Sequence, residues 1–159
     1  MKLTRTLILI GLIEAMLLVF PAVVRAQFNY ITYNGAAFIT GYTGTNATVV
    51  IPATIDGYPV TSIYATAFNG NQTITNVIIS GGITSIGDLA FANCDNLCQV
   101  TIPNSVTNVG DHAFWSCGFA SFIIPANTVM GNGALSSCIN LKNVTLPSHR
   151  KMKKWLEIS

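Results

Sequence analysis

The sequence predicts a β-rich repeat solenoid, and three observations support this prediction. The unit Ala-Phe-x-x-Cys that ends at Cys94 recurs 23 residues later and ends at Cys117. The aromatic register of this unit also extends in both directions, with steps of 23, 23 and 21 residues through Phe68, Phe91, Phe114 and Leu135. A short run of alternating apolar residues precedes each copy. Similarity at a fixed period of about 20 to 50 residues is typical of stacked repeats, which bury their apolar faces against one another.

The first 26 residues have the pattern of a secretory signal peptide. Lys2 and Arg5 form a positively charged n-region, and residues 7–24 form an apolar h-region interrupted by Glu14. Residues 24–26 provide a small-residue cleavage site. This order of regions is typical of signal peptides. An uncleaved anchor is the alternative, because the apolar run approaches the roughly 20 residues of a spanning helix. We expect cleavage, and hence a secreted or cell-surface protein with no membrane span after signal cleavage.

The charges of the predicted mature chain lie mostly at its C-terminal end. Residues 27–141 contain no Lys or Arg and four Asp, whereas residues 142–159 contain five of the eight Lys and Arg. Nucleic-acid binding depends on Lys and Arg that neutralise phosphates, so we expect no nucleic-acid partner for the repeats. A surface of Asn, Thr, Ser and Gly suits an uncharged protein or glycan at a cell surface or matrix. The sequence leaves the oligomeric state open.

Residues 27–46 are expected to form an N-terminal β-hairpin cap. Two alternating segments, residues 30–33 and 36–40, flank Asn34-Gly35. This dipeptide is typical of a type I′ turn because both positions need φ above zero. Without a cap, the first coil would expose an apolar end and an unpaired strand edge.

The solenoid is predicted at residues 47–147 as about four and a half coils. The coils are residues 47–74, 75–97, 98–119 and 120–141, with half a coil at 142–147. Each begins with a short strand whose alternation directs two residues into the core. These are Val49 and Ile51, Val77 and Ile79, Val100 and Ile102, Phe122 and Ile124, and Val144 and Leu146. The first coil is longer by five residues, which we assign to a turn at residues 56–59.

A second short extended segment is expected in each coil, at residues 61–63, 84–86 and 107–109 and around Met130. A glycine follows in three coils, and we expect positive φ in a sharp turn at Gly87, Gly110 and Gly131. The Ala-Phe unit after the turn should fill the coil. The phenylalanines of successive coils are therefore expected to stack.

Together, these positions resemble the BspA-like leucine-rich repeats, whose pattern runs Ile-Pro, Val-Thr-x-Ile-Gly and Ala-Phe-x-x-Cys. The match includes residues 101–119, TIPNSVTNVGDHAFWSCGF, and the similarity covers about residues 49–147. The resemblance implies a curved right-handed leucine-rich-repeat solenoid with short parallel strands, mainly secreted or on bacterial and some protist surfaces. It implies adhesion or protein binding, no cofactor and no catalytic residues. The pattern stops after Pro147, and residues 148–159 form a basic tail.

Three cysteines, Cys94, Cys117 and Cys138, follow the aromatic register by three residues, whereas Cys98 lies outside it. Side chains stacked in one register point the same way, so we expect buried thiols rather than disulfides. A Cys94–Cys98 disulfide is the alternative that export would permit. No metal site is expected, because a zinc site needs a second pair of ligands.

No enzymatic activity is expected. His112 lies at a variable position of the Ala-Phe unit, where the preceding coil has Leu89, and this favours a surface location. The other histidine, His149, belongs to the tail, so neither a Ser-His-Asp triad nor a histidine metal site is indicated. A secreted enzyme would require His112 to be buried beside a serine and a carboxylate.

The candidate binding residues face outward from the strands. One column is mostly β-branched and contains Val50, Ile78, Thr101, Ile123 and Thr145. The neighbouring column is polar and contains Thr48, Asn76, Gln99, Ser121 and Asn143. An exposed apolar stripe beside polar groups is typical of a protein-binding surface. The alternative is that these β-branched residues are present only because they are good strand formers. Trp115 and Tyr64 are aromatics at variable positions, and Trp115 is the better anchor because indoles are enriched at binding hot spots.

These observations predict a non-enzymatic, secreted or cell-surface module for protein binding or adhesion. The alternative is a structural or truncated repeat fragment with no specific ligand. Three interpretations suit the tail at residues 148–159. The first is an amphipathic helix that caps the last coil, and the second is a segment that adheres to an anionic surface. The third is a segment that does not belong to the repeat array, from a truncated or shifted reading frame.

Overall fold

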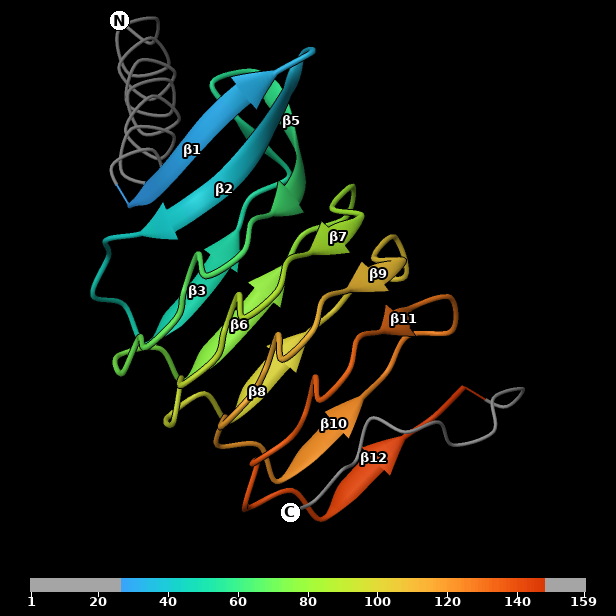
Figure 1. Ribbon diagram of the computed structural model, residues 1–159. Helices are drawn as coiled ribbons and strands as arrows, with labels where there is room; N and C mark the ends of the chain where they lie inside the picture. Colours follow the sequence, from blue (N-terminus) through green and yellow to red (C-terminus); the bar gives the residue numbers. More distant parts are fainter. Residues whose placement is uncertain (1–26, 148–159) are drawn as a thin grey trace, which may run out of the picture.

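The computed structural model describes residues 27–147, which form a β-solenoid of about five turns (Figure 1). The expected signal peptide at residues 1–26 and the basic tail at residues 148–159 lie outside the described residues. The described part consists of strands and turns without a helix. The predicted fold class, a repeat solenoid with an N-terminal hairpin, is confirmed.

One row of strands runs along the solenoid, with one strand from each turn (Figure 1). Its members are β3 (Thr48–Ile51), β6 (Asn76–Ile79), β8 (Gln99–Thr101), β10 (Ser121–Ile123) and β12 (Asn143–Thr145). The first three pair in parallel, with Val49, Val77 and Val100 in register. β10 pairs in parallel with β12, but it does not pair with β8. The row therefore consists of two small sheets.

A second row forms a continuous sheet on another side of the solenoid. Its parallel members are β5 (Tyr58–Ile63), β7 (Ser85–Ile86), β9 (Asn108–Val109) and β11 (Val129–Met130). These strands are the second extended segments predicted in each coil. β4 (Thr54–Ile55) pairs antiparallel with β5 around Asp56 and Gly57, whose φ values are 53° and 80°, so the extra residues of the first coil form a tight turn.

The N-terminal hairpin completes the open edge of the second sheet. β1 (Phe28–Tyr33) and β2 (Ala36–Tyr42) are antiparallel, and the turn residues Asn34 and Gly35 have φ values of 48° and 76°. β2 then pairs in parallel with β5. The Tyr30 hydroxyl also donates a hydrogen bond to the Asp56 carboxylate. The cap thus supplies both a paired strand edge and a contact to the first coil.

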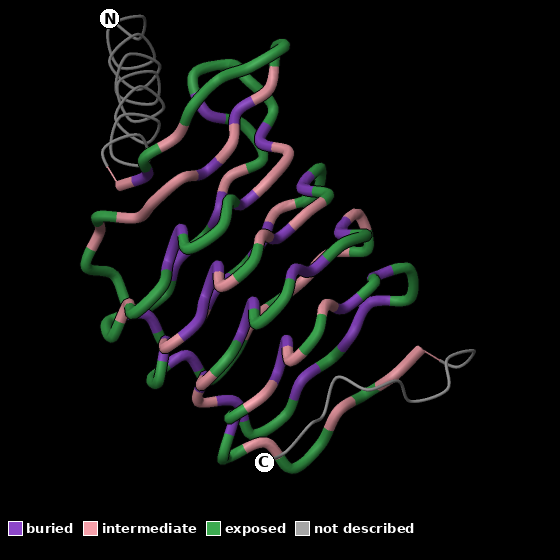
Figure 2. Tube along the Cα trace, viewed as in Figure 1, coloured by how far each residue is buried: buried purple, intermediate pink, exposed green. Residues whose placement is uncertain are grey.

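The core lies between the two rows, and Figure 2 shows buried residues recurring in the turns before the last one, which carries β12. Six of the ten predicted inward residues are buried, namely Val49, Ile51, Val77, Ile79, Phe122 and Ile124. The other four, Val100, Ile102, Val144 and Leu146, pack against this core but are only partly buried. Val144 and Leu146 belong to the last described turn, where no further described coil covers them. Val100 and Ile102 are in the middle of the array, so their exposure has another cause.

Stacked aromatic rings fill the centre of the coils, as predicted. Phe68 and Phe91 have ring centroids 4.6 Å apart at an interplanar angle of 15°, and Phe91 and Phe114 are 5.3 Å apart at 7°. Tyr42 of the cap stacks on Phe68 at 5.5 Å. At the other end Phe119 meets Phe114 edge to face. The rings therefore link the cap and successive coils through one set of contacts.

The prediction of positive φ at Gly87, Gly110 and Gly131 is wrong. Positive φ occurs two positions after each of these glycines, for example 55° at Leu89. The glycines are needed for space instead, because a Cβ on Gly87 would lie 2.5 Å from the backbone nitrogen of Ala65 in the preceding coil. Adjacent coils approach too closely at this corner for any side chain.

Candidate functional site

The predicted outward columns lie side by side on the first row of strands. We call the residues Val50, Ile78, Thr101, Ile123 and Thr145 the apolar stripe. Strand pairing places Val50, Ile78 and Thr101 one behind another, and it places Ile123 beside Thr145. Every member is exposed, and the aliphatic side chains of Val50, Ile78 and Ile123 retain 54%, 37% and 69% of their accessible surface. The strand alternation thus sets these side chains away from the core.

The polar column lies next to the stripe. Strand pairing places Thr48, Asn76 and Gln99 in register, and it places Ser121 beside Asn143. All of these residues are exposed except Asn76, which is partly buried. The Oδ1 atom of Asn76 is buried and has no hydrogen-bond partner within residues 27–147. The column therefore offers neutral hydroxyl and amide groups beside the aliphatic side chains.

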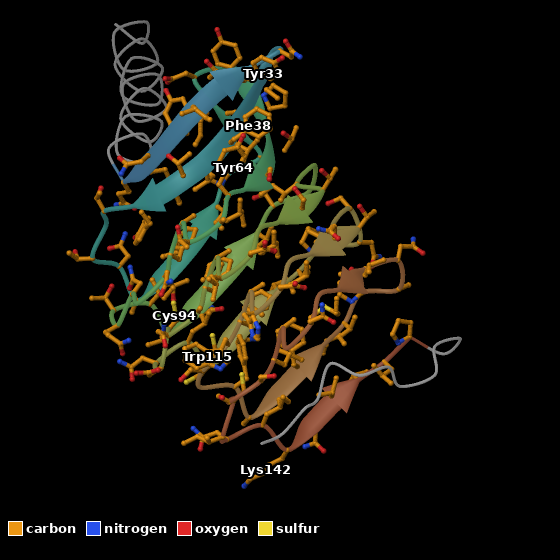
Figure 3. All side chains as sticks on the ribbon, in the orientation of Figure 1. Tyr33, Phe38, Tyr64, Cys94, Trp115 and Lys142 are labelled. Atoms are coloured by element: carbon orange, nitrogen blue, oxygen red, sulfur yellow. The ribbon has the colours of Figure 1, made fainter. Side chains whose placement is uncertain are left out.

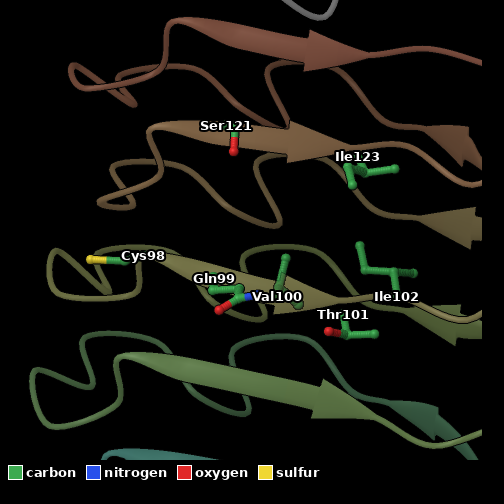
Figure 4. A pocket seen from close by; sticks show the side chains of 7 residues that line it. All are labelled: Cys98, Gln99, Val100, Thr101, Ile102, Ser121 and Ile123. Atoms are coloured by element: carbon green, nitrogen blue, oxygen red, sulfur yellow. The ribbon is translucent and has the colours of Figure 1, made fainter.

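The break between β8 and β10 opens a pocket on this face. The pocket has a volume of about 450 Å³. It is lined by Cys98, Gln99, Val100, Thr101, Ile102, Ser121 and Ile123. Figure 4 shows these side chains on the two neighbouring turns, with Val100 and Ile102 directed into the gap between the strands. The pocket accounts for the partial exposure of Val100 and Ile102.

The outward-facing columns predicted from the sequence did not reveal this pocket, although the spacing of the repeats contains a signal for it. Six positions separate Cys94 from Val100, but five separate Cys117 from Phe122. The corner that leads into β10 is therefore one residue shorter than the corner that leads into β8. A missing residue at a repeat corner is the feature that would have marked the break.

Trp115 belongs to a different surface from the stripe. It lies in the corner turn between Phe114 and Cys117, outside the strand row (Figure 3). Its side chain is 36% exposed, and Nε1 donates a hydrogen bond of 3.0 Å to Oγ of Ser137 in the next coil. The structure does not bring Trp115 together with the predicted columns.

A group of exposed and partly exposed aromatic residues lies on the cap and the first coil, where the sequence analysis singled out only Tyr64. Tyr33 is 68% exposed, and the rings of Phe38 and Tyr64 are 5.4 Å apart (Figure 3). Phe38 pairs with Ile31 across the hairpin, and Ile31 is also exposed. The pairing register of β1 with β2 was the signal that could have located this second apolar surface.

The three cysteines in register are buried and free, as expected. Each Sγ donates to the carbonyl oxygen of the phenylalanine one coil before, with distances of 3.1 Å for Cys94 to Phe68 and 3.2 Å for Cys117 to Phe91. Burial raises the pKa of the Cys94 thiol from 9.0 to about 12 and also raises the pKa values of the Cys117 and Cys138 thiols. These thiols are therefore protonated and unreactive at neutral pH.

Cys98 differs from the cysteines in register because it is exposed. It is not bonded to Cys94, and its Sγ donates to the Asn96 carbonyl oxygen at 3.2 Å. The alternative of a Cys94–Cys98 disulfide is wrong for this structure. Cys98 therefore places an accessible thiol at the edge of the pocket.

The charged residues of the coils have structural partners. Oδ1 of Asp88 accepts a hydrogen bond of 2.8 Å from the backbone N–H of Asp111, and Oδ1 of Asp111 accepts one of 2.6 Å from Asn132. His112 is exposed, so it is not buried beside a serine and a carboxylate. Within residues 27–147 no cluster of three or more His, Cys, Asp or Glu could hold a metal ion. The same part of the chain contains no helix long and apolar enough to cross a membrane.

Several solved structures share this fold. A leucine-rich repeat protein from Bacteroides capillosus is 26% identical with a TM-score of 0.67, and the match covers 77% of this chain and 95% of that one. A leucine-rich repeat protein from T. pallidum is 21% identical with a TM-score of 0.62, covering 76% and 79%. One from Bacteroides ovatus is 27% identical with a TM-score of 0.60, but this chain spans only 40% of it.

A comparison with curated proteins found no match. A family model did match, the BspA type leucine rich repeat region, in six copies across residues 61–155. This region covers more than half of the chain and includes the Ala-Phe-x-x-Cys units and the stacked coils described above. Repeat solenoids of this kind typically act as binding scaffolds and not as catalysts. The chain therefore belongs to the BspA-type leucine-rich repeat family.

Proposed function

We propose that this protein is a secreted or cell-surface module that binds another protein, without catalysis, through the apolar stripe. The observation that supports this proposal most directly is the exposure of three aliphatic side chains, Val50, Ile78 and Ile123, on one row of strands. Apolar side chains surrounded by neutral polar groups match the composition of protein interfaces, in which charged residues are depleted at the centre. Leucine-rich repeat domains also generally mediate protein interactions.

A protein partner fits this face better than a glycan or a nucleic acid. The stripe contains no aromatic ring on which a sugar could stack, and residues 27–141 contain no Lys or Arg to pair with phosphates. The neutral hydroxyl and amide groups of the polar column can donate and accept hydrogen bonds at the rim of an interface. Cell-surface proteins and matrix proteins are the partner class that we infer.

Export is the part of the proposal that rests on residues 1–26. Their sequence has the charged, apolar and cleavage regions of a signal peptide. Fusing these residues to a reporter should direct the reporter out of the cell, and N-terminal sequencing of the secreted chain should begin at Gln27. Retention of the reporter inside the cell would contradict the export proposal.

Substitutions on the stripe test the binding face. Ile78→Lys and Ile123→Lys place charges at the centre of the proposed interface, and each should weaken binding to cells or matrix by about tenfold or more, as expected for loss of a hot-spot contact. Val129→Lys is the matched control, because Val129 is similarly exposed at 56% but lies on the second sheet.

Thermal melting followed by circular dichroism must give the same transition for all three variants and the native chain, since each replaced side chain is exposed. Binding by surface plasmon resonance or cell adhesion then reports the interface alone. If the two stripe variants bind as strongly as the native chain, or if Val129→Lys is equally damaging, the stripe is not the binding face.

A further inference from the structure

We propose that the pocket between β8 and β10 receives one large, uncharged, apolar side chain of the protein partner. The pocket lies within the proposed binding face, since Thr101 and Ile123 belong both to the stripe and to the pocket lining. The inference therefore rests on the proposed function and deepens it. It identifies where on the stripe a partner is anchored and which kind of side chain provides the anchor.

The pocket originates from a local change in the repeat. The corner from Cys117 to Phe122 is one residue shorter than the corresponding corner before β8. Two rings, Phe119 and Phe122, occupy the space under β10 and pack edge to face against Phe114, at 5.8 Å and 5.3 Å. The corresponding residues of the preceding coil, Leu97 and Val100, are smaller. The shorter corner and the bulkier core coincide with the break, where no strand pairing joins β10 to β8.

The floor of the pocket is apolar because the break exposes part of the core. Val100 and Ile102 are partly exposed, whereas their equivalents in the preceding coil, Val77 and Ile79, are 0% and 3% exposed. Ile123 forms an aliphatic wall at 69% exposure. A partner side chain that covers these residues would remove apolar surface from water, at about 25 cal/mol for each Å² buried.

The rim of the pocket restricts the chemistry of the occupant. It consists of the neutral polar side chains of Gln99, Thr101 and Ser121, and no charged residue lines the pocket. A Lys or Glu side chain that entered would lose hydration without gaining an ionic partner, which is costly. The lining also contains no aromatic ring, so the pocket is poorly suited to a sugar. An uncharged aliphatic or aromatic side chain is the chemistry that matches this lining.

The size of the pocket agrees with this occupant. Its volume of about 450 Å³ falls within the range of pockets that bind small ligands, roughly 300 to 1,000 Å³. This is sufficient for one Leu, Phe or Trp side chain and the adjoining backbone. Large apolar side chains inserted into such pockets are the typical hot spots of protein interfaces.

Cys98 allows a test that requires no identified partner. Its thiolate exchanges with small asymmetric disulfides, so that a fragment becomes attached to Sγ and the leaving thiol is released. The probes are disulfides that carry isobutyl, benzyl, aminoethyl, carboxyethyl or glucosyl groups, in competition with 2-mercaptoethanol. Intact mass spectrometry of the full chain measures how much of each fragment is retained. Isobutyl and benzyl fragments should be retained at least about tenfold more than the charged and sugar fragments.

The matched control moves the thiol one coil back, with Thr75→Cys in a Cys98→Ser background. Thr75 is exposed and corresponds to Cys98, whose backbone N–H donates to the Thr75 carbonyl. The junction that corresponds to the pocket, between β6 and β8, is paired without a break. This variant should retain all fragments equally. A second variant, Thr101→Phe, should fill the pocket and reduce retention of the apolar fragments severalfold, while the reaction of Cys98 with methyl methanethiosulfonate is unchanged.

Equal retention of all fragments at Cys98, or the same apolar preference at the Thr75→Cys position, would overturn the proposal. Preferential retention of the glucosyl fragment would overturn it in favour of a glycan site. Because no partner is present, the result is independent of the proposed function. If Ile78→Lys leaves cell binding unchanged while the apolar fragments still select Cys98, the binding-face proposal fails and the pocket chemistry stands.

Discussion

Phe91→Ala tests whether the stacked rings hold the coils together. Phe91 is fully buried, and it stacks on Phe68 at 4.6 Å and on Phe114 at 5.3 Å. Replacing a buried Phe with Ala costs about 3 to 5 kcal/mol through lost burial and a residual cavity. Each favourable aromatic pair adds about 0.5 to 1.5 kcal/mol, and this substitution removes two. We therefore expect a loss near the upper end, about 4 to 5 kcal/mol in the free energy of unfolding.

Urea denaturation followed by circular dichroism measures this loss as a decrease in the transition midpoint. Phe91→Leu is the informative control, because Leu135 already occupies the same register in a later coil. It keeps most of the volume and loses the ring contacts, so its expected cost is about 1 to 2 kcal/mol. A cost below about 1 kcal/mol for Phe91→Ala, or equal costs for the two variants, would refute the ring-stacking argument.

Three further measurements test the packing of the corners and the cysteines. Gly110→Ala should destabilise the fold by about 1 to 3 kcal/mol, because the new Cβ would lie 2.6 Å from the backbone nitrogen of Asp88, whereas Gly81→Ala, with no atom within 4 Å, should be nearly neutral. At pH 8 a maleimide should label only Cys98 in the folded chain and all four cysteines in guanidinium, and rapid labelling of a second cysteine in the folded chain would contradict thiol burial. Folding raises the pKa of the Cys94 thiol from 9.0 to about 12, so the unfolded chain loses this proton first. This thiol alone should therefore lower the free energy of unfolding by about 1.4 kcal/mol per pH unit over that range, and the Cys117 and Cys138 thiols should add to the decline. Cys94→Ala should have a shallower decline in urea titrations between pH 9 and 11, and an unchanged slope would contradict the assignment.

Most of the fold could be predicted because the repeat shows the same pattern several times. Strand alternation located the inward residues, and the Ala-Phe register located the ring stack and the buried thiols. Asn34-Gly35 located the turn of the hairpin cap between two alternating segments, since few dipeptides tolerate two positive φ values. These features depend on local sequence, which is the information that a single chain supplies.

The role of the corner glycines could not be predicted because it depends on contacts between coils. Positive φ and close backbone approach both favour glycine, and the sequence does not distinguish them. The structure shows positive φ at Leu89 and His112, which have side chains, whereas Gly87 and Gly110 face the backbone of the preceding coil. The distance between neighbouring coils, and not the local conformation, selects glycine at these positions.

The pocket likewise follows from the relation between neighbouring coils, and it shows how a repeat array can acquire a specific site without losing its fold. In a solenoid each coil contacts only the coils beside it, so a one-residue difference affects a single junction. At this junction β8 and β10 are unpaired, but β9 and β11 remain paired on the second sheet, with Val109 and Met130 in register. The Cys138 thiol also donates to the carbonyl oxygen of Phe114 across the same junction. The second sheet and the corner contacts therefore hold the two coils together, and the strand row is free to differ at one point along an otherwise regular face.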